Sequence, residues 1–169
     1  MNHLKSMNSL FEHELNDLYS AESQIIEALP KMVKAASSEE LQIAFQQHLA
    51  VTEEQRKRLK NIFTQLKLDP GDDVCEGMKG LLEEAKEAVD AKGDSHVKDA
   101  ALISAAQRVE HYEIAAYGTA REFARVLGYD VIARMLDMTL HEEGDADKEL
   151  SRIGSGTFFE TGINETALR

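Results

Sequence analysis

The chain has 169 residues, of which 43% are hydrophobic and 30% are charged, and this composition suits one compact domain with a sizeable apolar core. Its 31 acidic residues outnumber its 19 basic residues, so the formal net charge is -12 and non-specific binding to nucleic acid or to an anionic membrane is disfavoured. Only two Pro and ten Gly accompany many Ala, Leu, Glu and Lys residues. We therefore expect an all-α protein whose natural partners are small cations.

Compartment and membrane association are predicted from the same residues. The first eight residues lack the apolar run of a signal peptide, and no stretch approaches the roughly 20 apolar residues that a membrane span needs. The single Cys75 cannot form an intramolecular disulfide. These features favour a cytoplasmic protein with no membrane partner.

The first predicted helix covers residues 6–36, with Ser6 or Asn8 as its cap. Apolar residues recur at helical spacing, and one acid, Glu22, stands among them. The stripe comprises Leu15, Leu18, Glu22, Ile25 and Leu29. Pro30 predicts either a kink or a helix end at Leu29, and the pattern beyond it favours the kink.

The second predicted helix covers residues 39–67 and starts at a Ser37-Ser38 cap. Its long stripe is polar in the middle, which a purely structural core seldom chooses. The stripe comprises Leu41, Phe45, His48, Thr52, Gln55, Leu59, Ile62 and Leu66, and Glu53 flanks it. Measured along the helix, His48 lies about 7.5 Å from the level of Glu53, so we interpret it as a hydrogen-bonded core histidine.

A shorter crossover helix is predicted over residues 72–92, followed by helices over 96–127 and 130–153. Both later helices carry acids where a core residue is expected. The first of these stripes comprises Ala106, Val109, Glu113, Ala116 and Ala120, and the second comprises Leu136, Leu140, Glu143, Asp147 and Leu150. We assign residues 1–153 to a helical bundle domain and residues 154–169 to a loosely ordered tail. Phe158, Phe159 and Ile163 of the tail could dock on the bundle or on a second subunit.

Counting from the loops indicates that these acids meet. In an antiparallel hairpin, residues equidistant from the loop lie at the same height. The loop centred on 37–38 therefore places Glu22 level with Glu53. The loop centred on 128–129 places Glu113 level with Glu143, and Glu110 level with Asp147. Two hairpins and a crossover helix thus predict a five-helix bundle with acids in its interior.

Several buried carboxylates cannot all stay ionised and unpaired, because each buried ion costs several kcal/mol. One or two divalent cations would relieve this cost, and oxygen-rich sites favour Mn, Fe(II), Mg or Ca. No organic cofactor is evident, because phosphate-binding Gly loops are absent and Cys/His zinc spacing is absent too.

Four segments resemble the YciE/YciF-type bacterial stress-protein family of the ferritin-like superfamily, and the similarity covers about residues 8–152. The segments are Leu18-Tyr19-Ser20-Ala21-Glu22, His48-Leu49 with Thr52 and Gln55, Val109 to Gly118, and Glu142-Glu143 with Asp147. The resemblance implies a ferritin-like four-helix bundle with an additional crossover helix, a homodimer and a dimetal site. The positions carried over as metal ligands are Glu22, Glu53, Glu110, Glu113, Glu143 and Asp147. No catalytic residue is assigned.

The chain departs from the Glu-x-x-His pattern of related metal sites, since Glu53 is followed three residues later by Arg56 and Glu142 by Asp145. The sequence is therefore compatible with a site that holds two ions, one ion or none.

Two functions are compatible with these features. The first is a stress-response protein that uses Fe or Mn in redox chemistry with peroxide or O2. The alternative is a non-catalytic structural homodimer whose interior acids are ion-paired.

Overall fold

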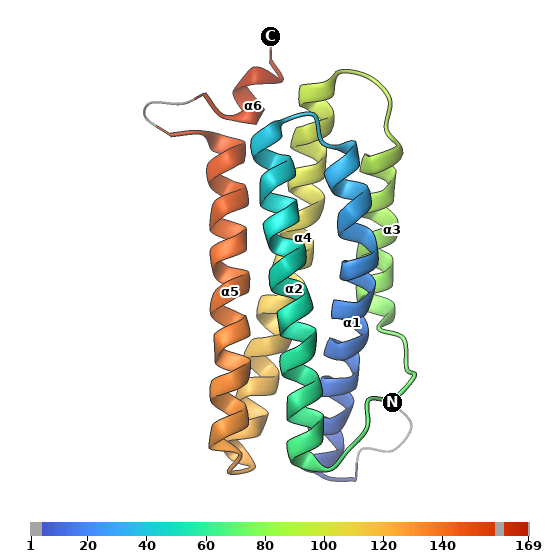
Figure 1. Ribbon diagram of the computed structural model, residues 1–169, viewed down its shortest axis with the longest axis vertical. Helices are drawn as coiled ribbons and strands as arrows, with labels where there is room; N and C mark the ends of the chain where they lie inside the picture. Colours follow the sequence, from blue (N-terminus) through green and yellow to red (C-terminus); the bar gives the residue numbers. More distant parts are fainter. Residues whose placement is uncertain (1–4, 158–160, 169) are drawn as a thin grey trace.

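The computed structural model describes residues 5–157 and 161–168, and it shows an all-α protein (Figure 1). Four long helices run side by side, and a shorter helix, α3, packs against α1 and α4. The short loops 36–38 and 127–129 make α1–α2 and α4–α5 antiparallel hairpins, which α3 connects. In chain order the helices are α1 (Met7–Ala35), α2 (Glu39–Leu66), α3 (Glu76–Asp90), α4 (Ser95–Val126), α5 (Asp130–Ser155) and the short α6 (Ile163–Thr166).

Local sequence signals set the helix ends. The side chain of Ser6 caps α1 by accepting from the backbone N–H of Ser9, and Asp94 caps α4 in the same way through His96 and Val97. Gly128 has a φ of 78°, a left-handed conformation that suits the tight loop before α5. Helix α1 continues through Pro30 to Ala35, so the alternative of a helix end at Leu29 is wrong.

The apolar core consists of two clusters that lie at different levels of the bundle. The first includes Ile25, Leu29, Phe45, Leu102, Leu150 and Ile153. The second includes Leu15, Leu18, Leu59, Ile62, Tyr117 and Leu136. On every long helix, the buried residues between the two clusters are polar. The acids singled out in the sequence therefore fall in a layer between two apolar clusters.

The C-terminal segment adds to the first of these clusters. Helix α5 extends to Ser155, two residues beyond the predicted domain boundary, and α6 packs against α4 and α5. Ile163 is buried there, which agrees with the expectation that it docks on the bundle. Phe158 and Phe159 lie outside the described residues.

None of the helices in the described part of the chain combines the length and the apolar character that a bilayer crossing requires.

Candidate functional site

Four glutamates from three helices lie in the layer between the two apolar clusters. Glu22 comes from α1, Glu110 and Glu113 come from α4, and Glu143 comes from α5. All four are buried, with at most 2% of their surface exposed. The two hairpins therefore direct carboxylates to one level of the interior.

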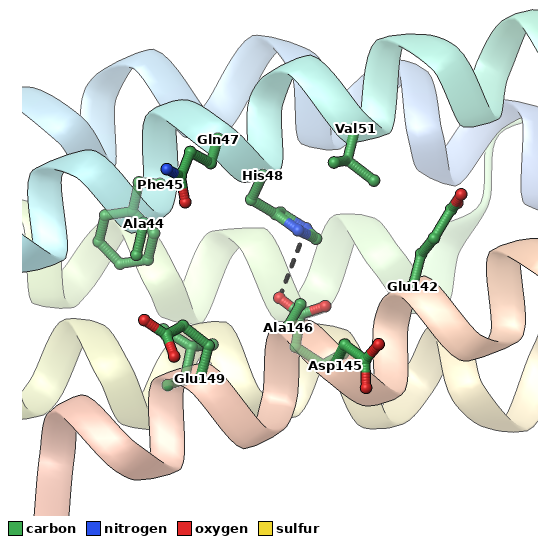
Figure 2. A pocket seen from close by; sticks show the side chains of 11 residues that line it. Ala44, Phe45, Gln47, His48, Val51, Glu142, Asp145, Ala146 and Glu149 are labelled. Atoms are coloured by element: carbon green, nitrogen blue, oxygen red, sulfur yellow. Dashed lines mark ion pairs between the residues drawn. The ribbon is translucent and has the colours of Figure 1, made fainter.

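His48 of α2 joins three of these acids in one compact cluster. One ligand atom from each of His48, Glu110, Glu113 and Glu143 lies within 4.8 Å of the others. The sequence predicted a hydrogen-bonded core histidine, but Nε2 of His48 has no hydrogen-bond partner. It lies 3.5 Å from Oε1 of Glu110, on the side of α2 that faces α5 (Figure 2).

Glu22 lies beside this cluster and is held from α4. The hydroxyl of Tyr117 donates a hydrogen bond to Oε1 of Glu22, and both residues are fully buried. The other carboxylate oxygen, Oε2, has no partner. Tyr117 therefore orients one acid, in addition to packing in the second apolar cluster.

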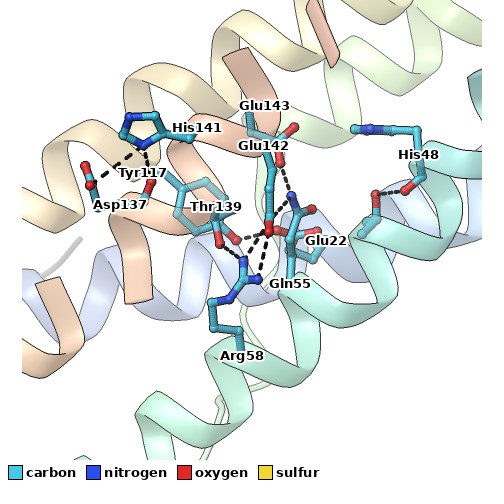
Figure 3. A network of polar contacts seen from close by, with 11 residues as sticks. Glu22, His48, Gln55, Arg58, Tyr117, Asp137, Thr139, His141, Glu142 and Glu143 are labelled. Carbon is cyan, nitrogen blue, oxygen red and sulfur yellow. Dashed lines mark hydrogen bonds and ion pairs between the residues drawn. The ribbon is translucent and has the colours of Figure 1, made fainter. Parts of the chain in front are cut away.

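A polar network links Glu143 of the cluster to side chains of α2 and to the neighbouring Glu142 (Figure 3). Nε2 of Gln55 donates to Oε1 of Glu143 and, at 3.1 Å, to Oε2 of Glu142. Arg58 binds Glu142 through two nitrogens, at 2.7 and 2.9 Å, and also donates to Thr139. The guanidinium group therefore neutralises Glu142, and the amide of Gln55 links this pair to Glu143.

Two residues carried over from the resemblance do not belong to the cluster. Glu53 is exposed on α2, because the inward face of that helix carries Thr52 and Gln55. Asp147 is partly exposed, and it accepts a hydrogen bond from Gln107 at 3.0 Å. Counting from the loop predicts the level of Glu53 along the bundle axis, but it does not predict which face of α2 carries this residue. Glu53 lies on the outward face.

Many buried atoms around the cluster lack any hydrogen-bond partner. Glu113 has no partner for either carboxylate oxygen. The other such atoms at the site are Oε2 of Glu22, Oε2 of Glu110, Oε2 of Glu143, Oε1 of Gln55 and Nε2 of His48. Burying a polar atom without a hydrogen-bond partner costs free energy. Because so many such atoms gather at one point, we infer that a positively charged partner is missing there.

Burial also shifts the ionisation of these groups. It raises the pKa of Glu22, Glu110 and Glu113 well above the usual value, and neighbouring negative carboxylates raise the pKa further. Burial raises the pKa of Glu143 to about 7, and it lowers the pKa of His48 to about 4. His48 is therefore neutral near pH 7, and its contact with Glu110 is not an ion pair.

These donors have the chemistry of a divalent cation site. A neutral imidazole nitrogen and several carboxylate oxygens suit Fe, Mn or Zn. Among the described residues, no Lys or Arg forms an ion pair with Glu22, Glu110, Glu113 or Glu143. The residues present therefore fit a bound metal ion.

The buried acids are easier to predict from the sequence than the side chains that surround them. His48 and Gln55 both belong to the predicted polar stripe of α2, so a signal for them was available. The roles of Arg58 and Thr139 depend on contacts between α2 and α5. No pattern within a single helix predicts such contacts.

Comparisons with known proteins agree with this architecture. Residues 6–165 match the family described as "Domain of unknown function (DUF892)". The chain is 43% identical to Protein YciF of Escherichia coli (strain K12) over 151 residues, which are 89% of this chain and 91% of that protein. The crystal structure of the E. coli stress protein YciF superposes with a TM-score of 0.85, covering 88% of this chain and 94% of that one.

Two further structures show the same fold. YcfI of Rhodopseudomonas palustris, described as a candidate structural protein, is 41% identical and has a TM-score of 0.86, over 89% of this chain and 96% of that chain. A protein of Xanthomonas campestris pv. campestris is 19% identical and has a TM-score of 0.69, over 86% of this chain and 88% of that chain. The chain therefore belongs to the DUF892 family, together with the stress protein YciF.

Proposed function

We propose that this chain is a ferritin-like stress-response protein that binds a divalent cation, Fe or Mn, in the layer between its two apolar clusters. The relationship to YciF supports the stress-response role. Two antiparallel hairpins that carry inward-facing glutamates support the ferritin-like assignment. The reaction that we propose is redox chemistry with peroxide or O2.

The observation that carries the proposal is the set of unpartnered buried atoms around Glu113. Both oxygens of Glu113 lack a partner, and three other side chains bring a ligand atom to the same point. A divalent cation would satisfy these atoms together and would offset the repulsion among the carboxylates.

One ion per chain fits the arrangement better than two. His48, Glu110, Glu113 and Glu143 form one group of ligand atoms. The amide of Gln55 and the guanidinium of Arg58 already donate hydrogen bonds to Glu143 and Glu142. A second ion would have to displace these donors.

The surrounding residues would position the ligands. Tyr117 holds Glu22 through its hydroxyl, and Gln55 holds Glu143 through its amide. His48 would offer its unpartnered nitrogen, and the carboxylates would offer oxygen. A bound Fe or Mn ion would supply the one-electron chemistry that these side chains lack.

Metal analysis of protein purified without chelator tests the proposal. The wild-type protein should hold about one Fe or Mn ion per chain, and Glu113→Gln should hold almost none, because ligand removal weakens metal binding. Glu53→Gln is the matched control, since Glu53 is an exposed glutamate outside the cluster. It should retain the full metal content. A wild-type protein without metal after incubation with Fe(II) or Mn(II) would contradict the proposal.

The alternative is a non-catalytic structural homodimer. The description of the Rhodopseudomonas relative as a candidate structural protein favours this reading, and so do the raised glutamate pKa values, because protonated acids need no cation. In that case the protein would sediment as a dimer and would bind neither Fe(II) nor Mn(II). The ion-paired form of this alternative lacks support, since no described Lys or Arg forms an ion pair with Glu22, Glu110, Glu113 or Glu143, and Arg58, Arg121 and Arg152 pair with other acids.

A further inference from the structure

A pocket of about 290 Å³ opens between α2 and α5, directly beside the candidate metal site. His48 and Glu110, two members of the cluster, form part of its lining. We propose that this pocket is the entrance to the site, and that a small uncharged molecule binds in it beside the ion. This inference rests on the proposed function, and it adds the route by which a reactant reaches the metal ion and the chemical class of that reactant.

The pocket is the side on which solvent approaches the cluster. The side chain of His48 is 11% exposed, whereas that of Glu110 is 3% exposed. Glu113 and Glu143 are fully buried. Figure 2 shows His48 projecting from α2 across the pocket toward α5. A molecule that enters between these helices therefore reaches His48 and Glu110 first.

The walls of the pocket favour molecules without charge. Ala44, Phe45, Val51, Ala146 and Leu150 provide an apolar lining. Among the described residues, no Lys or Arg lines the pocket, so an anion would find no positive side chain to replace its water. The volume lies near the lower end of the range for small-molecule sites, which fits a small reactant.

Apart from Glu110, the acids that line the pocket are paired with bases. Glu142 pairs with Arg58 at 2.7 Å, Asp145 with Lys148 at 2.8 Å and Glu149 with Arg152 at 2.7 Å. They therefore add little attraction for a second cation, and they still disfavour anions at close range. Oε2 of Glu110 and Nε2 of His48 are buried polar atoms of the pocket residues without a hydrogen-bond partner. They are available to the metal ion and to a molecule that binds beside it.

Nitric oxide, a small uncharged probe, tests the inference on protein loaded anaerobically with Fe(II). Its binding to Fe(II) gives an electron paramagnetic resonance signal that requires no turnover. Ala146→Phe narrows the pocket, and we expect it to slow Fe(II) uptake and to weaken nitric oxide binding by at least about tenfold. Val51→Phe, from the opposite wall, should act in the same direction.

Ala28→Phe is the matched control. Ala28 lines a different pocket, between α1 and α3, which contains no member of the cluster. This variant should take up Fe(II) and bind nitric oxide as the wild type does. Circular dichroism of all three variants verifies that the helical fold is retained.

Several outcomes would overturn the inference. Fe(II) loading and nitric oxide binding at wild-type rates in both pocket variants would exclude this route. Binding of azide, a small anion, as tightly as nitric oxide would contradict the preference for uncharged molecules. A wild-type protein that takes up no Fe(II) would instead contradict the proposed function itself, and metal analysis detects that outcome separately.

Discussion

The amide of Gln55 holds two neighbouring carboxylates of α5 in place. It donates to Glu143, which belongs to the cluster, and to Glu142, which Arg58 neutralises. This hydrogen bond also opposes the rise in the pKa of Glu143 that burial causes. Gln55 therefore acts as a positioning residue for a ligand, without contributing a negative charge.

Replacing Gln55 with Leu should weaken cation binding by about 10- to 100-fold, because the partner that orients Glu143 is lost. Titration of the metal-free protein with Mn(II) against a competing chelator would measure the affinity. Gln65→Leu serves as the control, since Gln65 is exposed and distant from the cluster. Equal affinities for the two variants would show that Gln55 does not position the ligand.

Single residues were predicted with mixed success, and geometry explains the difference. Glu22, Glu113 and Glu143 stand within apolar stripes, so their burial follows from helical periodicity. Glu53 flanks its stripe by one residue, which turns it by about 100° around the helix axis and exposes it. His48 is not predicted as a ligand because it lies far from the level of Glu53, but Glu53 itself does not belong to the cluster.

At the scale of the helices, one buried acid fixes the first hairpin against the second. Asp99, near the start of α4, accepts hydrogen bonds from the backbone N–H groups of Ser37 and Ser38, both at 2.8 Å. Asp99 is fully buried, so its carboxylate depends on these bonds and not on solvent. The contact ties the α1–α2 loop to α4 and helps to set the relative height of the two hairpins.

We expect Asp99→Ala to lower the free energy of unfolding by about 2–4 kcal/mol, because it leaves two backbone donors without an acceptor. Urea denaturation would measure this loss. Asp90→Ala, at the exposed C-terminal end of α3, should leave the stability nearly unchanged. A similar small effect of both substitutions would refute the structural role of Asp99.

The helices themselves could be predicted closely from the sequence. Ser6, Ser38, Asp94 and Gly128 provide strong local signals, and helices α1 to α5 were predicted with ends within a few residues of those observed. The role of Asp99 could not be predicted in this way. It depends on a contact between residues more than 60 positions apart, which no cap or period encodes.

At the scale of the whole molecule, the polar layer makes stability depend on pH. The raised pKa values mean that the folded protein keeps protons that the unfolded chain has released above pH 4.5. Stability contributed by the protonated acids is therefore lost as the pH rises through their folded values, which for Glu143 is about 7. His48 acts in the opposite direction, but only between its folded pKa of about 4 and its ordinary value of 6.5.

The metal-free protein should consequently become less stable between pH 6.5 and about pH 8. Thermal unfolding in the presence of chelator would measure this decrease. Adding Fe(II) or Mn(II) should reverse it, because a bound cation favours the ionised acids. Stability that is constant or that rises over this interval without metal would contradict the assignment of buried, unpaired acids.

The central claim is that one cation belongs between the two apolar clusters. Anomalous scattering at the Fe and Mn absorption edges, from a crystal of protein loaded with either metal, tests it most directly. We predict one strong peak per chain, among His48, Glu110, Glu113 and Glu143. A peak only at surface acids, or no peak in the presence of excess metal, would contradict the account.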